Sequence, residues 1–405
     1  MILQSEHLGD DVQHDLEQHG DQSGGEREDL GGQDAAQAER DARAAPSDRA
    51  SPLQRLPDLR GRPPFAQDEQ HDAGDDHDRA EQDDPEKEIL ALRPMTCPFQ
   101  FQAYLTQTHS YRDLPLRYNE TSTLFRNEAS GEMHGLIRVR QFTISEGHIA
   151  CTPEQLEGEF AGCLELAKYM LTTLGLEEDV FYRFSKWDKN NREKYIGSEE
   201  AWEAAQDTMR RILNDLKIDY YEADGEAAFY GPKLDIQIKN VHGKEDTLIT
   251  IQIDFQLAEK FGMEYVDRDN KRKYPYVIHR TSIGCYERTL AYLIEKYAGA
   301  FPLWLAPEQV RIMTITNRAD DYAYQLKDRL EKEGMRVSVD DRNEKIGFKV
   351  REAQTQKIPY MLVLGDQEVE NGTAALRSRK NENFGAMPVA DIIAKLREEI
   401  DSKAR

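Results

Sequence analysis

The chain has 405 residues, a formal net charge of −23 at pH 7 and a hydrophobic content of 39%, a length that suits two or three domains. No run approaches the roughly eighteen apolar residues of a membrane span, which argues against a membrane protein. The four cysteines (97, 151, 163 and 285) lack the paired spacing of a disulfide scaffold, so we expect a cytoplasmic protein.

The acidic charge is concentrated at the start of the chain. Residues 1–86 contain 24 Asp and Glu, 8 Arg and no Lys, which gives this segment a net charge of −16. Its scarcity of apolar residues predicts a disordered segment, and the absence of Lys raises the hypothesis of a wrong reading frame. The remainder carries only −7, so the usual argument that an acidic protein avoids nucleic acid applies to this segment alone.

Globular patterning begins after Lys87. Residues 122–128 and 136–143 are predicted strands joined by a Gly-containing loop, and a period of two would place Arg126 and Glu128 on one side of the first. Thr152-Pro153-Glu154-Gln155 is a capping box that predicts a helix ending at Gly175. Cys163 lies in the apolar stripe of that helix and is expected in the core.

The rest of the chain predicts two further groups of elements. Strands at 234–238, 248–255 and 276–279, with a helix from Gly284 to Tyr297, indicate a mostly antiparallel sheet with flanking helices. After a linker at 301–307, strands at 310–315, 337–339 and 359–364 alternate with helices ending near Gly334 and Gln356. We therefore expect an α+β fold with a disordered segment (1–86), an antiparallel sheet domain (87–300) and a small α/β domain (301–405).

Two groups of residues suggest phosphate chemistry. A guanidinium such as that of Arg126 suits a phosphate, and the carboxylate of Glu128 can accept from the amine of adenine. Taken alone, this pattern is better explained by an ordinary cross-strand ion pair on a sheet surface. Further on, Gly284 precedes a helix that carries Arg288 in its first turns, where an anion is favoured, so a second cation is available for a triphosphate.

These residues carry a resemblance to a known family. Phe125-Arg126-Asn127-Glu128 resembles motif 2 and Gly284 to Arg288 resembles motif 3 of the class II aminoacyl-tRNA synthetases. Within that class the chain is similar to threonyl-tRNA synthetases from about residue 88 to its end, with local matches at 93–98, 110–117, 134–140, 228–233 and 342–349.

The resemblance implies that ATP, with Mg²⁺, activates L-threonine as the adenylate before transfer to tRNA(Thr). By position, Arg126 would hold the α-phosphate, Glu128 the adenine amine, and Arg288 the distal phosphates with help from Arg138. The matching substrate positions are Met95, Glu146, Tyr230, Lys233 and Gln252. The matching anticodon positions are Asn343, Lys345, Glu368 and Arg377, a polar set of the kind that reads splayed bases.

The resemblance also implies a catalytic Zn²⁺ on Cys97, His148 and His279. A thiolate and two imidazoles with a fourth position open is how zinc is held when a substrate must reach it. Chelation by the amino and hydroxyl groups of threonine would reject valine, which an apolar pocket alone rejects only about a hundredfold. Without the resemblance, each of the three residues is equally compatible with a structural role.

Several positions depart from the family pattern. Phe99, Gln100, Ile144, Glu146 and Cys285 replace the usual residues near the amino-acid pocket, and Glu146 replaces a shorter carboxylate. Motif 1 and an editing domain are not recognised, which predicts an N-terminally truncated synthetase whose family homodimer is in doubt. The alternative function is a catalytically impaired fragment that acts as an RNA- or nucleotide-binding module.

Overall fold

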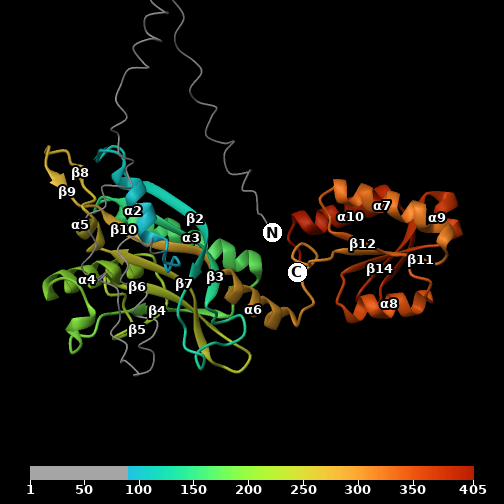
Figure 1. Ribbon diagram of the computed structural model, residues 1–405, viewed down its shortest axis with the longest axis horizontal. Helices are drawn as coiled ribbons and strands as arrows, with labels where there is room; N and C mark the ends of the chain where they lie inside the picture. The colour runs from blue at the N-terminus through green and yellow to red at the C-terminus, as the bar shows by residue number, and fades with distance from the viewer. Residues whose placement is uncertain (1–89) are drawn as a thin grey trace, which may run out of the picture. The chain divides into compact units, whose positions relative to one another are not determined.

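The computed structural model describes residues 90–405, so the predicted disordered segment lies outside the described residues. Two sheet-based regions follow each other along this part of the chain (Figure 1). Across residues 90–405, no helix combines the length and apolarity that crossing a bilayer requires.

The first region is built on a seven-stranded sheet with the strand order β2-β3-β10-β7-β6-β4-β5. Every neighbouring pair is antiparallel except β4 and β5, which are parallel. The strands are β2 (Leu116–Phe125), β3 (Gln141–Cys151), β4 (Val180–Ser185), β5 (Tyr220–Ala223), β6 (Lys233–Lys239), β7 (Glu245–Asp254) and β10 (Tyr276–Cys285).

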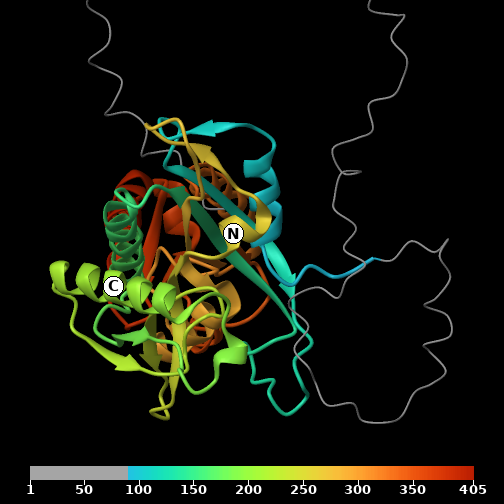
Figure 2. The ribbon, with the colours of Figure 1, turned by 90° about the vertical axis from the view of Figure 1, so that its left-hand side faces the viewer.

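Alternation along the strands gives this sheet one apolar and one polar face. In β6, Leu234, Ile236 and Ile238 belong to the main core, whereas Lys233, Asp235 and Gln237 alternate with them. Three helices supply the rest of the core: α3 (Leu156–Leu174), α4 (Glu199–Asp215) and α6 (Tyr286–Tyr297). Figure 2 shows α2 (Cys97–Leu105) and α3 on opposite sides of the sheet, so α2 covers the polar face.

A three-stranded sheet with the order β1-β8-β9 accompanies the large one. Its strands are two residues long each: β1 (His109–Ser110), β8 (Tyr265–Val266) and β9 (Arg272–Lys273). The short helix α5 (Leu257–Phe261) leads from β7 into β8 and ends at Gly262.

The first predicted strand pair is offset from the observed one. β2 ends at Phe125 and β3 begins at Gln141, so Arg126, Glu128 and Arg138 lie in the loop between the strands rather than on strand faces. The prediction is wrong here because the ladder closes where the Arg126 N–H donates to the Arg140 carbonyl at 2.8 Å. The loop residues beyond that point satisfy their polar groups locally.

Other local predictions are confirmed at least in part. The Gln155 amide oxygen accepts from the Thr152 N–H at 3.0 Å, which is one half of the predicted capping box, but α3 begins at Leu156 with Gln155 as its N-cap. Gly175 ends the helix as predicted, with a φ of 77°. Cys163 is buried in the core. The predicted strand at 276–279 continues to Cys285, because its pairing with β3 resumes after an irregularity between Thr281 and Cys285.

The second region is a five-stranded sheet with the order β12-β11-β13-β14-β15. β11 (Val310–Thr314) is parallel to β12 (Val337–Asp340) and β13 (Tyr360–Leu364), and β14 (Thr373–Ser378) and β15 (Asn383–Pro388) continue it antiparallel. Its helices are α7 (Asp320–Lys332), α8 (Ile346–Thr355), α9 (Asp366–Asn371) and α10 (Val389–Asp401). The predicted α/β pattern is confirmed for β11 to β13, whereas β14, β15 and α10 were not predicted.

Candidate active site

A cleft with a volume of about 220 Å³ opens on the polar face of the seven-stranded sheet. It is bounded by the β2–β3 loop, by β7 and by the junction of β10 with α6. The predicted site residues that line it are Arg126, Glu128, Arg138, Glu146, Gln252, His279 and Arg288. Sequence-distant parts of the chain therefore contribute to one cavity.

Strand register explains how four of the predicted residues come together. His148 in β3 pairs with His279 in β10, His279 pairs with Gln252 in β7, and Gln252 pairs with Lys233 in β6. Directly paired residues project to the same face, so these side chains form one row across four adjacent strands. This row lies on the polar face.

The three predicted metal ligands are neighbours. His148 Nε2 lies 2.9 Å from His279 Nδ1, and Cys97 Sγ lies 3.5 Å from the same nitrogen. Cys97 comes from the first residue of α2, which brings its thiol to the row of histidines. All three side chains are buried.

The outer nitrogens of both imidazoles are held by residues that the sequence reasoning did not assign. His148 Nδ1 lies 2.8 Å from Gln100 Oε1, and His279 Nε2 lies 2.9 Å from Asp254 Oδ2. Such partners fix ring orientation around metal-binding histidines. Simple spacing could have found both, because Gln100 is three residues after Cys97 on a helix and Asp254 is two after Gln252 on a strand.

Burial and neighbouring charge act differently on the two histidines. Burial lowers the pKa of His148 well below its usual value, so this imidazole is neutral and able to ligate. Burial also lowers the pKa of His279, but Cys97 and the hydrogen bond to Asp254 outweigh it and raise that pKa to about 10. A divalent cation bound in place of the extra proton on His279 would be stabilised by the same two groups, Cys97 and Asp254, because its positive charge is larger than that of a proton.

The donor set fits a zinc ion. One sulfur and two imidazole nitrogens converge from three different elements, with the outer imidazole nitrogens already occupied. Soft thiolate and imidazole ligands favour zinc over magnesium or calcium, which prefer oxygen. With three protein ligands, tetrahedral coordination leaves a fourth position.

The arginines of the cleft are fixed by backbone and aromatic contacts. The Arg288 guanidinium donates to the Ile137 carbonyl at 3.0 Å and to the Thr247 carbonyl at 2.6 Å, which ties α6 to the β2–β3 loop and to β7. The Arg126 guanidinium lies 5.2 Å from the centre of the Phe142 ring. Neither has a carboxylate partner among the ion pairs of the described residues, so both charges are available to an anion.

Glu128 and Arg138 are paired with each other. Arg138 Nε donates to Glu128 Oε2 at 2.8 Å, and Arg138 Nη2 lies 3.4 Å from Glu132. The alternative to nucleotide contacts was an ordinary ion pair between Arg126 and Glu128. An ion pair of Glu128 is present, but its partner is Arg138 instead of Arg126. Glu128 and Arg138 both line the cleft.

The remaining substrate positions surround the histidines. The Tyr230 hydroxyl donates to Gln252 Oε1, and the Tyr230 ring stacks on His279 with centroids 4.7 Å apart. Lys233 Nζ lies 3.0 Å from Asp235, a buried carboxylate. Met95 stands just before α2, with its carbonyl accepting from Arg93 Nε at 3.3 Å, and is not among the residues that line the cleft.

The four predicted anticodon positions occupy three segments of the second region. Asn343 and Lys345 lie between β12 and α8, and Glu368 lies in the first turn of α9, directly after β13. Both segments follow the carboxyl ends of parallel strands, where α/β sheets bind ligands. Arg377 lies within β14, paired with Met361, and the Glu368 carboxylate also accepts from the Gly365 N–H at 2.9 Å.

Comparison with family models matches two domains. Residues 79–297 match the tRNA synthetase class II core domain (G, H, P, S and T), and residues 309–399 match an anticodon binding domain. The first match alone spans more than half of the chain.

Comparison with individual proteins gives consistent relatives. The chain is 61% identical over 321 residues to a threonine–tRNA ligase of Clostridium perfringens, covering 79% of this chain and 50% of that protein. It is 46% identical over 316 residues to a threonine–tRNA ligase of a Geobacillus species, covering 78% of this chain and 49% of that protein. A crystal structure titled as the RNA binding domain of threonyl-tRNA synthetase from Cryptosporidium parvum superposes with a TM-score of 0.70 at 32% identity and 76% coverage of both chains. The chain spans about half the length of the curated relatives it matches.

Proposed function

The chain belongs to the class II aminoacyl-tRNA synthetases, and from this premise we propose that it is a threonine–tRNA ligase. It would use ATP to activate L-threonine as the adenylate and then transfer the threonyl group to tRNA(Thr). The observation that carries the proposal is the position of the Cys97–His148–His279 cluster beside a cleft lined by Arg126 and Arg288, two cations without a carboxylate partner among residues 90–405. An amino acid held at the cluster would present its carboxylate to a nucleotide in the cleft.

We propose Zn²⁺ as the ion held by Cys97, His148 and His279. When bound, it would supply a Lewis-acid centre that recognises adjacent amino and hydroxyl groups, which threonine has and valine lacks. The chain's own residues orient that centre: Gln100 and Asp254 fix the two imidazoles, and the Tyr230 ring packs on His279.

Catalysis would rest on alignment and charge neutralisation. The amino-acid carboxylate attacks the α-phosphorus of ATP and pyrophosphate leaves, so the protein must hold the reactants in line and stabilise added negative charge. We assign the α-phosphate to Arg126 and the distal phosphates to Arg288, with Mg²⁺ accompanying ATP. No side chain needs to form a covalent intermediate.

A threonine-dependent ATP–pyrophosphate exchange assay tests this function. We expect exchange in the zinc-replete protein, a loss of at least about a hundredfold in Arg126→Ala and Arg288→Ala, and no exchange with valine. Lys332→Ala, an exposed change in α7, is the matched control and should leave exchange unchanged. If the folded, zinc-loaded protein shows no exchange, the enzyme proposal fails and the RNA- or nucleotide-binding alternative is favoured.

We also propose that the second region reads the anticodon of tRNA(Thr). Asn343, Lys345, Glu368 and Arg377 are the positions assigned to this role. A matching test is tRNA aminoacylation by Asn343→Ala, which should raise the KM for tRNA without altering amino-acid activation. The family homodimer stays a prediction that light scattering of the purified chain can check.

A further inference from the structure

Glu146 lies with the three proposed zinc ligands. One ligand atom each from Cys97, Glu146, His148 and His279 lies within 4.8 Å of all the others. Glu146 precedes His148 by two residues in β3, so both side chains leave the same face of the strand. Four possible ligand atoms, not three, thus lie close enough together to share one ion.

We propose that Glu146 is a fourth zinc ligand, which closes the coordination sphere until an amino acid displaces it. This inference rests on the zinc site of the proposed function and adds a specific role for one residue. Glu146 would then be a displaceable metal ligand and not only a contact for the substrate hydroxyl.

Coordination chemistry favours a carboxylate at this position. Zinc binds Asp and Glu oxygens at about 2.0–2.2 Å and is almost always tetrahedral when four protein ligands are present. One thiolate and one carboxylate with two neutral imidazoles balance the charge of Zn²⁺, which matters because an uncompensated charge in a buried site is costly.

Contacts around Glu146 hold the carboxylate near the cluster. The Thr96 hydroxyl donates to Glu146 Oε2, and Thr96 directly precedes the ligand Cys97. The Gln100 side-chain amide, which also contacts His148, donates to the Glu146 backbone carbonyl at 3.3 Å. The same short helix therefore positions the thiol, one imidazole and the carboxylate.

Exposure distinguishes Glu146 from the other three ligands. Cys97, His148 and His279 are buried, whereas Glu146 is partly exposed, although both Glu146 and His279 line the cleft. The partly exposed ligand is the one that an incoming amino acid can replace without disturbing the rest. Aspartate at this position would withdraw its oxygen by about one carbon–carbon bond, roughly 1.5 Å, and would not reach the ion from this backbone.

Cobalt substitution tests the proposal through the metal itself. We would load the full chain with Co²⁺ and record its visible absorption, which reports ligand number and type, together with the metal dissociation constant. We expect Glu146→Gln and Glu146→Asp both to alter the amino-acid-free spectrum and to weaken metal binding at least about tenfold. Glu165→Gln, an exposed carboxylate of α3, is the control and should leave both unchanged.

The Asp variant separates ligation from charge. If Glu146 only provides negative charge or orients the substrate, Glu146→Asp will keep the wild-type spectrum and metal affinity, and the inference is overturned. If the wild-type chain binds neither Co²⁺ nor Zn²⁺, the zinc site of the proposed function fails instead.

A measurement on the unaltered protein avoids dependence on variant folding. Infrared difference spectra on adding Zn²⁺ should show a shift of carboxylate stretching bands that threonine then reverses. Zinc binding without any carboxylate change would refute Glu146 as a ligand.

Discussion

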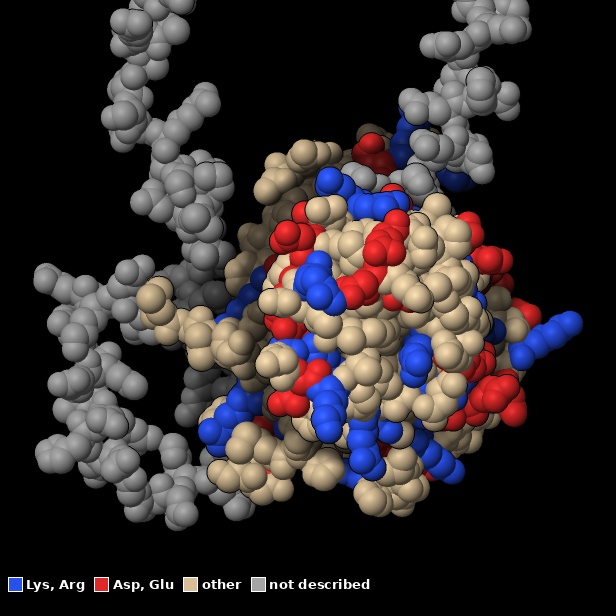
Figure 3. Space-filling model, turned by 90° about the vertical axis from the view of Figure 1, so that its right-hand side faces the viewer, with Lys and Arg blue, Asp and Glu red and all other residues tan. Residues whose placement is uncertain are grey.

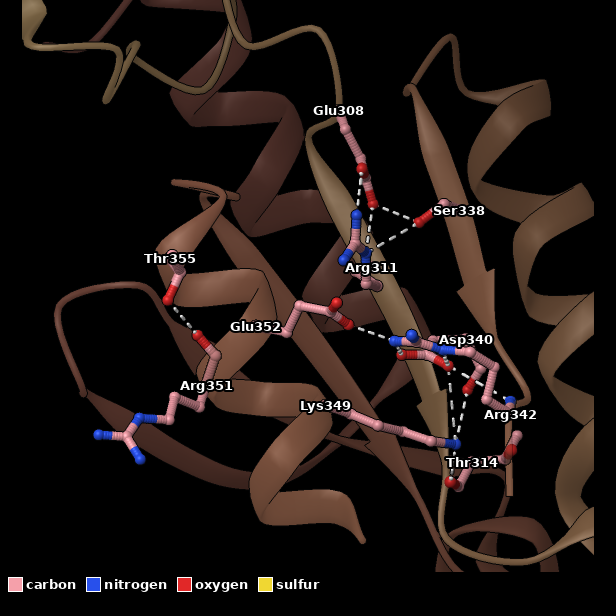
Figure 4. Close-up of polar contacts among 10 residues, drawn as sticks. All are labelled: Glu308, Arg311, Thr314, Ser338, Asp340, Arg342, Lys349, Arg351, Glu352 and Thr355. Carbon is pink, nitrogen blue, oxygen red and sulfur yellow. Dashed lines mark hydrogen bonds and ion pairs between the residues drawn. The ribbon is translucent and has the colours of Figure 1, made fainter. Parts of the chain in front are cut away.

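Lys349 is a charged side chain with only 1% of its surface exposed. Its ammonium donates to the Thr314 and Asp340 carbonyls at 2.9 Å each and lies 3.9 Å from the Asp340 carboxylate (Figure 4). Thr314 ends β11 and Asp340 ends β12, so one residue of α8 joins the carboxyl ends of two parallel strands. A buried charge persists only when it is fully paired in this way.

We expect Lys349→Met to destabilise the second region by about 2–4 kcal/mol, because two buried carbonyls and Asp340 would lose a donor. Hydrogen exchange of the full chain measures this as faster exchange in peptides from β11, β12 and α8. Arg351→Met is the matched control, since the Arg351 guanidinium points away from the network in Figure 4. Equal exchange in both variants would contradict a structural role for the Lys349 contacts.

Asp340 couples the same network to pH. Hydrogen bonds from Arg342, at 2.9 and 2.7 Å, hold the pKa of Asp340 below its usual value. Because the folded pKa is the lower one, the stabilisation is present above the unfolded value of about 3.9 and is lost as the pH falls through the folded pKa.

We therefore expect Asp340→Asn to lower stability at pH 7 by about 1–2 kcal/mol, with the difference from wild type shrinking below about pH 4. Half of the Arg342 side chain is exposed, which keeps the estimate small. The difference is measured by urea unfolding of both proteins at pH 7 and pH 3.5, with hydrogen exchange in β12 as the signal that monitors unfolding. If the loss of stability in Asp340→Asn were the same at pH 7 and at pH 3.5, the carboxylate charge could not be its source.

At the scale of elements, the sequence predicted the existence of the central strands better than their boundaries. The predicted strands at 234–238, 248–255 and 276–279 correspond to β6, β7 and β10, and the observed register places His279, Gln252 and Lys233 in one row. The β2–β3 boundaries could not be predicted, because residues on both sides of Phe125 alternate similarly and only the cross-strand bond at Arg126 ends the ladder.

The partners of the histidines escaped prediction for a different reason. Asp254 and Gln100 acquire their roles only through contacts with residues 25 and 48 positions away. Local spacing places Gln100 on the helix face of Cys97 and Asp254 on the strand face of Gln252, but it does not identify the histidines as their partners. The metal ligands themselves were assigned by family resemblance, since their sequence separations of up to 182 residues carry no local signal.

Gly284 shows how one backbone position shapes the cleft. It has a φ of +73°, and a Cβ there would lie 1.9 Å from the Leu248 carbonyl oxygen of β7. A glycine is needed because β10 crosses β7 closely just before α6 delivers Arg288 to the cleft.

We expect Gly284→Ala to destabilise the first region by at least about 2 kcal/mol and to reduce ATP–pyrophosphate exchange. Gly162→Ala is the control, because Gly162 lies on α3 with no atom within 4 Å of a built Cβ and should be neutral or stabilising by up to about 1 kcal/mol. Chemical denaturation and exchange assays on both variants measure the two effects. Wild-type stability in Gly284→Ala would show that β10 can move away from β7.

At the scale of the whole molecule, charge is divided unequally along the chain. Residues 1–86 carry −16 of the net charge of −23. On the face that Figure 3 shows, the Lys and Arg side chains of the described residues are interspersed with Asp and Glu, without a large area of one sign. A tRNA bound as proposed would therefore meet mixed charges on this face, together with an acidic segment elsewhere in the chain.

The acidic segment should slow the encounter with tRNA, because like charges repel over about a Debye length. We expect a chain beginning at Lys87, with a net charge of −7, to associate with tRNA about three- to tenfold faster at low ionic strength. The difference should vanish above roughly 0.3 M salt. Stopped-flow binding of fluorescent tRNA measures the rate. A full-length chain with sixteen of the segment's 24 Asp and Glu residues changed to Asn and Gln, which balances its 8 Arg, separates charge from bulk. If the neutralised chain still binds as slowly as the wild type, the effect is steric, and the charge argument is wrong.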